Sequence, residues 1–392
     1  FMGYRAGILN DTTSNNTFLG YYAGERNRNS NNVAVGAQAG RFYSISNNST
    51  TEMTSVGTEA GHGAFLNPKS TAVGFRALYS RQGGTLHGNT IGRNTAVGDS
   101  AMAWAGFGQS NVAIGTEALS RVDNGNFNVA IGDSSLAGSL NTDGNVAIGY
   151  KTLSKQQGQG YNTAVGFYSQ RDSSKNTYYN TSIGAYSMEY NRTGIYNTGL
   201  GLSAMRFADS TSYNTVVGAD AMYNHKKNGS NLAAGAFSLR GDSAGYWNTA
   251  LGSEAMDRFG FDGTASGTGF SNVAVGFRAL RQARQAWENT AVGVGALESD
   301  SSGNFNTAVG RYSGFLNKRG SYNVSMGMES GVQNDSANAT TFIGYLSGYY
   351  NKNNYNTGVG AYSLTYNNFT TGAITTGAEN TGLGYGAGYR IN

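Results

Sequence analysis

Few side chains in this chain of 392 residues have the types that carry out acid–base or metal chemistry. The three histidines, His62, His87 and His225, lie at different positions of the chain's internal repeat, so they do not form a ligand set. Glu117 and Asp133 are acids that neighbouring coils of a repeat fold would place diagonally, and a glycosidase needs two carboxyl groups about 5–10 Å apart. Mixed charge at the equivalent positions favours a solvated face instead. We therefore expect no catalytic residues and no enzyme.

Two oxygen-rich segments are candidates for a metal site. Residues 123–126 read Asp-Asn-Gly-Asn and residues 141–145 read Asn-Thr-Asp-Gly-Asn, and both offer the oxygen ligands that Ca²⁺ prefers. Gly and Asn also supply the left-handed backbone of tight turns, which explains both segments without a metal. The chain has no Cys, which excludes thiolate sites and disulfides, and it has no P-loop pattern. We expect no metal and no cofactor.

Aromatic residues recur at one position of the repeat. Tyr161, Tyr179, Tyr196 and Tyr213 come from four consecutive copies, so a repeat fold would stack their rings as one stripe. Stacked rings suit the apolar faces of sugars, and the hydroxyls add hydrogen bonds. The same rings could instead shield strand ends or pack against a neighbouring chain. The four tyrosines are the candidate glycan-contact stripe.

These residues are positioned by a repeat of Asn-Thr-Ala-Val-Gly, as at residues 94–98, 162–166, 289–293 and 306–310. Its Gly, here called the marker glycine, occurs 22 times, and 14 of the 21 spacings are 17 residues. β-branched residues two apart, bounded by Gly and Asn, indicate a short strand. A 17-residue unit is too short for a helix-containing repeat. The prediction is an all-β fold, a parallel β-solenoid of about 22 coils that forms a single continuous domain over residues 1–392.

An Asn precedes the marker glycine by four residues in most copies. Equivalent residues of stacked coils lie about 4.8 Å apart, so amide side chains in one column can hydrogen-bond from coil to coil. We expect a structural Asn ladder rather than a ligand site. Its expected members are Asn94, Asn111, Asn128, Asn145, Asn162, Asn180, Asn197, Asn214, Asn231 and Asn248.

The residue between the two β-branched positions is mostly Ala, and it faces the opposite side of the strand. Small residues at one phase allow another backbone to approach closely, and a repeat presents the same face at every height. We therefore expect a parallel homotrimer whose axis is lined by Ala113, Ala130, Ala147 and Ala164.

Four longer spacings predict insert loops near residues 41–52, 79–93, 257–271 and 365–379. Such inserts are either tolerated drift in loop length or part of a binding face. The net charge of +4 is spread thinly, without the basic block of a nucleic-acid-binding surface, so no nucleic-acid partner is expected. No run of 18 apolar residues occurs, so we expect no membrane span in this chain.

The copies at residues 111–115, 128–132 and 145–149, each Asn-Val-Ala-Ile-Gly, resemble the head repeats of trimeric autotransporter adhesins of the YadA-like type. Looser versions resemble repeats in phage tail fibres and in large bacterial surface fibre proteins. The resemblance implies a left-handed β-roll, three chains side by side and an adhesive role. The repeat here is slightly longer than the adhesin repeat, and coiled-coil stalk heptads and membrane-anchor strands are lacking.

The expected function is a structural and adhesive segment of an extracellular fibre, on a cell or virion surface, with host or surface glycans as further partners. The alternative is the shaft of a phage tail fibre used in host recognition. A third, from another class, is a polysaccharide-cleaving spike. Because the chain opens and closes within a repeat, we also expect an internal segment of a longer fibre.

Overall fold

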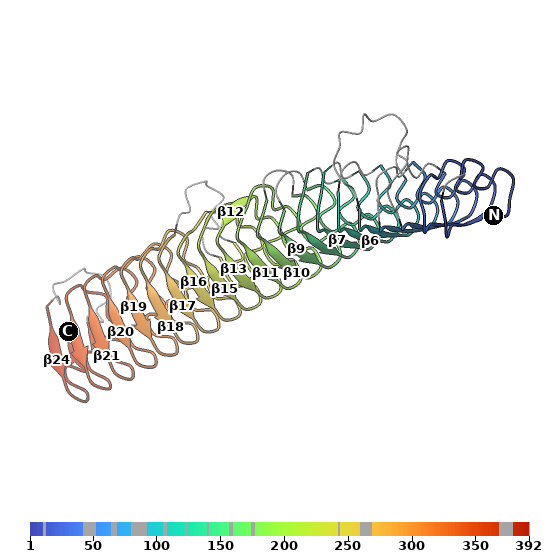
Figure 1. Ribbon diagram of the computed structural model, residues 1–392. Helices are drawn as coiled ribbons and strands as arrows, with labels where there is room; N and C mark the ends of the chain where they lie inside the picture. Colours follow the sequence, from blue (N-terminus) through green and yellow to red (C-terminus); the bar gives the residue numbers. More distant parts are fainter. Residues whose placement is uncertain are drawn as a thin grey trace. The chain divides into compact units, whose positions relative to one another are not determined.

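The computed structural model describes residues 1–10, 13–41, 52–63, 69–79, 92–104, 108–121, 124–138, 141–156, 160–173, 177–241, 244–258, 269–367 and 379–391. It divides into two compact units, Phe1–Ile195 and Tyr196–Asn392. Each unit is a stack of short parallel strands, one strand from each coil (Figure 1).

In the first unit, successive coils contribute strands that pair only with their neighbours in the chain. The register is one to one, so that Val112, Ala113 and Ile114 lie opposite Val129, Ala130 and Ile131. The strands are β1 (Thr17–Leu19), β2 (Val33–Val35), β3 (Thr54–Val56), β4 (Thr71–Val73), β5 (Thr95–Val97), β6 (Val112–Ile114), β7 (Val129–Ile131), β8 (Val146–Ile148), β9 (Thr163–Val165) and β10 (Thr181–Ile183).

The second unit repeats this arrangement and adds two small parallel pairs, β12 with β14 and β23 with β25. Its main strands are β11 (Thr198–Leu200), β13 (Thr215–Val217), β15 (Leu232–Ala234), β16 (Thr249–Leu251), β17 (Val273–Val275), β18 (Thr290–Val292), β19 (Thr307–Val309), β20 (Val324–Met326), β21 (Thr341–Ile343), β22 (Thr357–Val359) and β24 (Thr381–Leu383). The added strands are β12 (Ser210–Ser212), β14 (Lys227–Gly229), β23 (Tyr366–Asn367) and β25 (Arg390–Ile391).

The prediction of an all-β parallel solenoid with a 17-residue spacing is confirmed. The described residues contain strands and turns but no helix, and hence no helix able to cross a membrane. A single domain over residues 1–392, left-handed coils and a trimer stay predictions. Most of the four expected insert loops, and His87 with them, lies outside the described residues.

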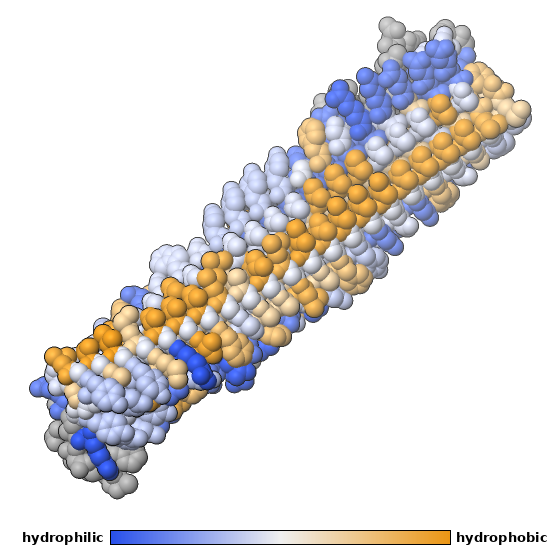
Figure 2. All heavy atoms as spheres, turned by 90° about the horizontal axis from the view of Figure 1, so that it is seen from below, coloured by the Kyte–Doolittle hydropathy of each residue, from blue (hydrophilic) through white to orange (hydrophobic). Residues whose placement is uncertain are grey.

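The prediction that the Ala column lines an axis between chains is wrong. Ala113, Ala130, Ala147 and Ala164 are completely buried inside their own coils. The strand residues on either side of each Ala are partly or well exposed, as Ile114 is at 40%. The β-branched and aliphatic residues therefore form the outer face, where apolar side chains line up in rows along the coils of each unit (Figure 2).

The physical reason is the narrow interior of a 17-residue coil. The buried Ala of the strand shares this space with a Leu or Met four residues after the marker glycine, such as Leu119 or Leu136, both fully buried. Where the strand centre is a large Phe18, that later position is Gly24, whose added Cβ would lie 2.6 Å from the Phe18 ring. Large and small residues alternate across the core because it has room for one large side chain.

The marker glycines allow the coils to stack backbone on backbone. Gly166 has a φ of +132°, in the region that favours glycine, and an added Cβ would lie 2.6 Å from the carbonyl oxygen of Gly184 in the next coil. Glycine at this column is therefore required twice, for the backbone conformation and for the close approach.

Candidate functional site

The Asn column forms a hydrogen-bonded ladder in the first unit, from Asn94 to Asn180. The Oδ1 of Asn111 accepts the backbone N–H of Asn128 at 2.8 Å and its side-chain amide at 3.2 Å. The Nδ2 of Asn128 also donates to the carbonyl oxygen of Thr142 at 2.7 Å. Asn145 repeats the contact with the Oδ1 of Asn128, at 2.9 and 3.0 Å. The amides are buried, and their hydrogen bonds connect each coil to the next. The amides are therefore structural rather than available to a ligand.

In the second unit the ladder includes Asn197, Asn214, Asn231 and Asn248. Thr340 replaces the amide in one coil, and its Oγ1 contacts the Oδ1 of Asn323 at 2.7 Å. A single hydroxyl thus keeps the connection to the coil before it.

A second buried polar column, seven residues after the marker glycine, has no counterpart among the sequence predictions. Asn317 accepts the Gly320 N–H at 2.9 Å and donates to the Gly320 carbonyl oxygen at 3.1 Å, which closes the turn. Asp300 holds the same place and accepts the Gly303 N–H at 2.7 Å. Burial raises the pKa of Asp300 well above its usual range. The column mixes Asn, Asp, Gln, Ser and His, and this variety conceals it in the sequence.

Within each unit, two of the four tyrosines of the candidate glycan-contact stripe stack on one another. The rings of Tyr161 and Tyr179 stack at 5.4 Å, and those of Tyr196 and Tyr213 at 5.2 Å. All four remain exposed, from 44% for Tyr196 to 60% for Tyr213. Each pair thus leaves apolar ring surface exposed to solvent.

The second unit contains a longer aromatic column, of which Phe305 and Tyr322 occupy the same repeat position as the stripe tyrosines. The ring centroids of its members follow one another at 4.9 to 5.7 Å. Several members sit one residue earlier in the repeat than the stripe tyrosines, so a search at a single position misses them. The column consists of Tyr246, Phe270, Trp287, Phe305 and Tyr322.

The stripe tyrosines all have left-handed backbone, with φ of 61° at Tyr161 and 56° at Tyr179. In earlier coils the same place is held by Asn15 and Asn31, with φ of 58° and 65°. Asn adopts this conformation readily, whereas a bulky residue there is uncommon. The ring therefore sits where a small polar residue would satisfy the turn equally well.

The residues with potential for catalysis or metal binding lie in structural surroundings. His62 is buried and stacks on the ring of Tyr79 at 5.2 Å, and burial lowers its pKa. In the candidate calcium turns, the Asp143 carboxylate accepts the backbone N–H of Asn126 at 2.7 Å. Asn124 donates to Asn141 at 3.1 Å, and Asp123 lies outside the described residues. Among the described residues, no three His, Asp or Glu side chains come together as a metal site.

No family model, curated protein or solved structure matches this chain. The resemblance to adhesin head repeats therefore rests on the repeat motif itself. The fold exposes the aromatic rings and the outer apolar rows to solvent.

Proposed function

We propose that this chain is a structural and adhesive segment of an extracellular surface fibre. Its coils form a regular scaffold, and its stacked aromatic rings bind glycans. The observation that carries the proposal is the exposed pair Tyr161 and Tyr179, held 5.4 Å apart over a buried amide ladder.

The energetics of the turn support a role beyond packing. A non-glycine residue in left-handed backbone costs on the order of 1–2 kcal/mol, and Asn reduces this cost by local hydrogen bonding. Ring stacking returns about 0.5–1.5 kcal/mol. The two terms nearly cancel, so fold stability gives little reason to keep a Tyr where Asn15 and Asn31 serve elsewhere. A pair of rings that leaves apolar surface exposed for sugar contact does give a reason.

The test is a double variant, Tyr161→Asn with Tyr179→Asn, assayed on a glycan array beside the wild type. Because Asn occupies this place natively, the variant should fold and keep its unfolding temperature within a few degrees. We expect it to lose binding to the glycans that the wild type retains. The matched control is Tyr4→Asn, since Tyr4 stacks on Tyr21 at 5.6 Å in a different column. Unchanged binding by the double variant would refute the adhesive role of the rings, and release of new reducing ends would point to a cleaving spike.

Self-association is the second part of the proposal. Chains with left-handed coils assemble in parallel as a homotrimer. The outer rows, such as Val112, Val129 and Val146, repeat at every coil and are only partly buried. A second copy in parallel register meets the same residues at each height, and closed rotational symmetry satisfies all copies equally. The contact is thus assigned to the outer aliphatic face and not to the buried Ala column.

Charges introduced into this face test the assembly. Ile131→Lys with Ile148→Lys should shift the particle to a lower mass in light scattering, because an apolar contact rejects unpaired charge. Asn124→Lys with Asn141→Lys places the same charges on exposed turns and should leave the mass unchanged. A wild type that is monomeric at all concentrations would refute the trimer.

A further inference from the structure

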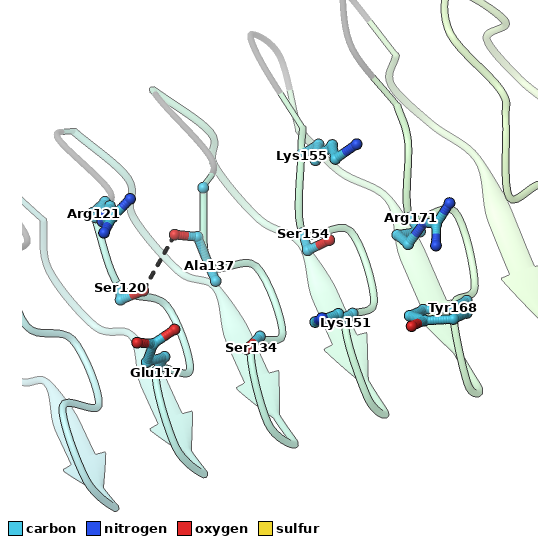
Figure 3. A pocket seen from close by; sticks show the side chains of 11 residues that line it. Glu117, Ser120, Arg121, Ser134, Ala137, Lys151, Ser154, Lys155, Tyr168 and Arg171 are labelled. Atoms are coloured by element: carbon cyan, nitrogen blue, oxygen red, sulfur yellow. Dashed lines mark hydrogen bonds between the residues drawn. The ribbon is translucent and has the colours of Figure 1, made fainter.

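A groove of about 420 Å³ lies on the surface of the first unit and crosses four consecutive coils (Figure 3). Three columns of the repeat line it, at two, five and six residues after the marker glycine. The first column holds Glu117, Ser134, Lys151 and Tyr168; the second holds Ser120, Ala137, Ser154 and Arg171; the third holds Arg121, Gly138 and Lys155.

The groove exists because one coil has small residues in all three columns. Ser134, Ala137 and Gly138 stand where the coils on either side carry Glu117 with Arg121, and Lys151 with Lys155. Figure 3 shows these long side chains on both sides of the coil that carries Ser134 and Ala137. The hollow is therefore set by local sequence and not by the regular repeat.

The walls are cationic. Within the described residues, no ion pair joins Arg121 or Lys151 to an acid, and a hydrogen bond with Tyr150 raises the pKa of Lys151. Among the residues that the structure describes, the acid partner of Lys155 is Asp172, at 3.5 Å.

Arg171 is the preoriented cation of the set. It lies 3.0 Å from the buried carboxylate of Glu189, and its guanidinium sits 4.5 Å over the Tyr168 ring centroid. Positive charge therefore stands on both sides of the coil that carries Ser134, and Glu117 is the one acid among the residues that line the groove.

We propose that this groove binds an acidic saccharide, a sugar unit that bears a carboxylate or sulfate group. Lys151 and Arg121 pair with the anionic group, and the hydroxyl oxygens of Ser120, Ser134 and Ser154 accept hydrogen bonds from the sugar hydroxyls. The hydroxyls of Ser120 and Ser134 themselves donate to the Ala137 carbonyl and the Asp133 carboxylate. The volume falls within the ~300–1,000 Å³ of sites for small ligands. A single hollow with hydroxyls and an acid at one end suits a sugar unit better than an extended nucleic-acid backbone.

The experiment measures the affinity of the full chain for four probes: polygalacturonate, dextran sulfate, uncharged dextran and duplex DNA. Comparison of the affinities for polygalacturonate and dextran sulfate shows whether the groove prefers a carboxylate or a sulfate group. Arg121→Gln with Lys151→Gln should weaken binding to the preferred acidic polysaccharide by about tenfold or more, since charge-assisted hydrogen bonds contribute about 1.5–3 kcal/mol each. Lys226→Gln with Lys227→Gln removes the same charge from exposed positions of the second unit and should change binding less than twofold.

A filling variant keeps the charge and removes the hollow. Ser134→Tyr should fold, because Tyr168 holds the same column with a φ of 56° against 54° at Ser134. It should weaken binding as strongly as the charge variant, with an unchanged circular dichroism spectrum as the folding control. Equal binding of uncharged dextran, tighter binding of DNA than of both acidic polysaccharides, or full binding by Ser134→Tyr would each overturn the proposal. The double variant Tyr161→Asn with Tyr179→Asn leaves the groove residues unchanged. The proposals for the groove and for the aromatic rings are therefore tested independently.

Discussion

Removing one buried amide from the ladder should lower the free energy of unfolding far more than removing an exposed amide. The side chain of Asn128 makes four hydrogen bonds: its Nδ2 donates to the Asn111 Oδ1 and the Thr142 carbonyl, and its Oδ1 accepts both N–H groups of Asn145. In Asn128→Ala the backbone N–H of Asn145 and the carbonyl of Thr142 lose these partners in a buried site. Each orphaned group costs about 1–3 kcal/mol, which gives a loss of about 2–6 kcal/mol.

The matched variants separate the hydrogen bonds from the volume. Asn128→Thr should lose less than Asn128→Ala, because Thr340 shows that a hydroxyl can maintain the link to the preceding coil. Asn124→Ala removes one exposed hydrogen bond, to Asn141 at 3.1 Å, and should cost under about 1 kcal/mol.

Urea unfolding monitored by circular dichroism gives the free energies, and hydrogen exchange locates the damage. In a solenoid each coil contacts mainly its neighbours, so the lost protection should centre on the coils that contain Asn111 and Asn145. If Asn128→Ala and Asn124→Ala unfold at the same urea concentration, the ladder contributes nothing beyond an exposed amide. The reasoning from buried hydrogen bonds would then be refuted.

Three further predictions are checked by urea or thermal unfolding monitored by circular dichroism. Gly310→Ala should destabilise by several kcal/mol, because its Cβ would lie 2.6 Å from the Gly327 carbonyl oxygen at a φ of +132°; a neutral effect would contradict the close approach. Burial raises the folded-state pKa of Asp300, so stability falls as the pH rises from the ordinary Asp pKa through the raised one. Asp300→Asn should therefore raise the unfolding temperature more at pH 8 than at pH 4, and an equal shift at both would argue against titration. Ala130→Leu should cost about 1–3 kcal/mol by overpacking, whereas Ile131→Leu on the outer face should be nearly neutral.

The repeat predicts most of the fold because the local pattern and the stacking geometry agree. The strand Val129–Ile131 and the ladder contact of Asn128 both follow from a fixed spacing of small units. Which face of the strand is buried does not follow from the sequence. Alternation with a period of two assigns residues to two faces but does not identify the inner one. Ala130 is inside because the coil interior has little room beside Leu136, a property of the closed coil and not of the strand.

The candidate sites were predictable to different degrees. The stripe tyrosines recur at one phase, so the stacking of Tyr161 on Tyr179 could be expected. Trp287 joins an aromatic column from a neighbouring phase, because rings reach across more than one backbone position. The groove depends on three small residues in one coil, Ser134, Ala137 and Gly138, a signal visible only once the columns are known to share a surface.

The one-to-one register of the strands makes length an adjustable property of this protein. Ala113 pairs with Ala130, and Ala130 pairs with Ala147, through identical contacts. If the 17 residues from Val129 to Asn145 were deleted from the gene, Val112 would meet Val146 with the same geometry and the same amide below it. Slippage or recombination in whole repeats therefore gives a foldable chain, and the 18-residue spacing between the paired Thr163 and Thr181 shows that a coil also accommodates one extra residue. Selection can thus lengthen or shorten such a protein in steps of one coil, without the loss of a core that a globular domain would suffer.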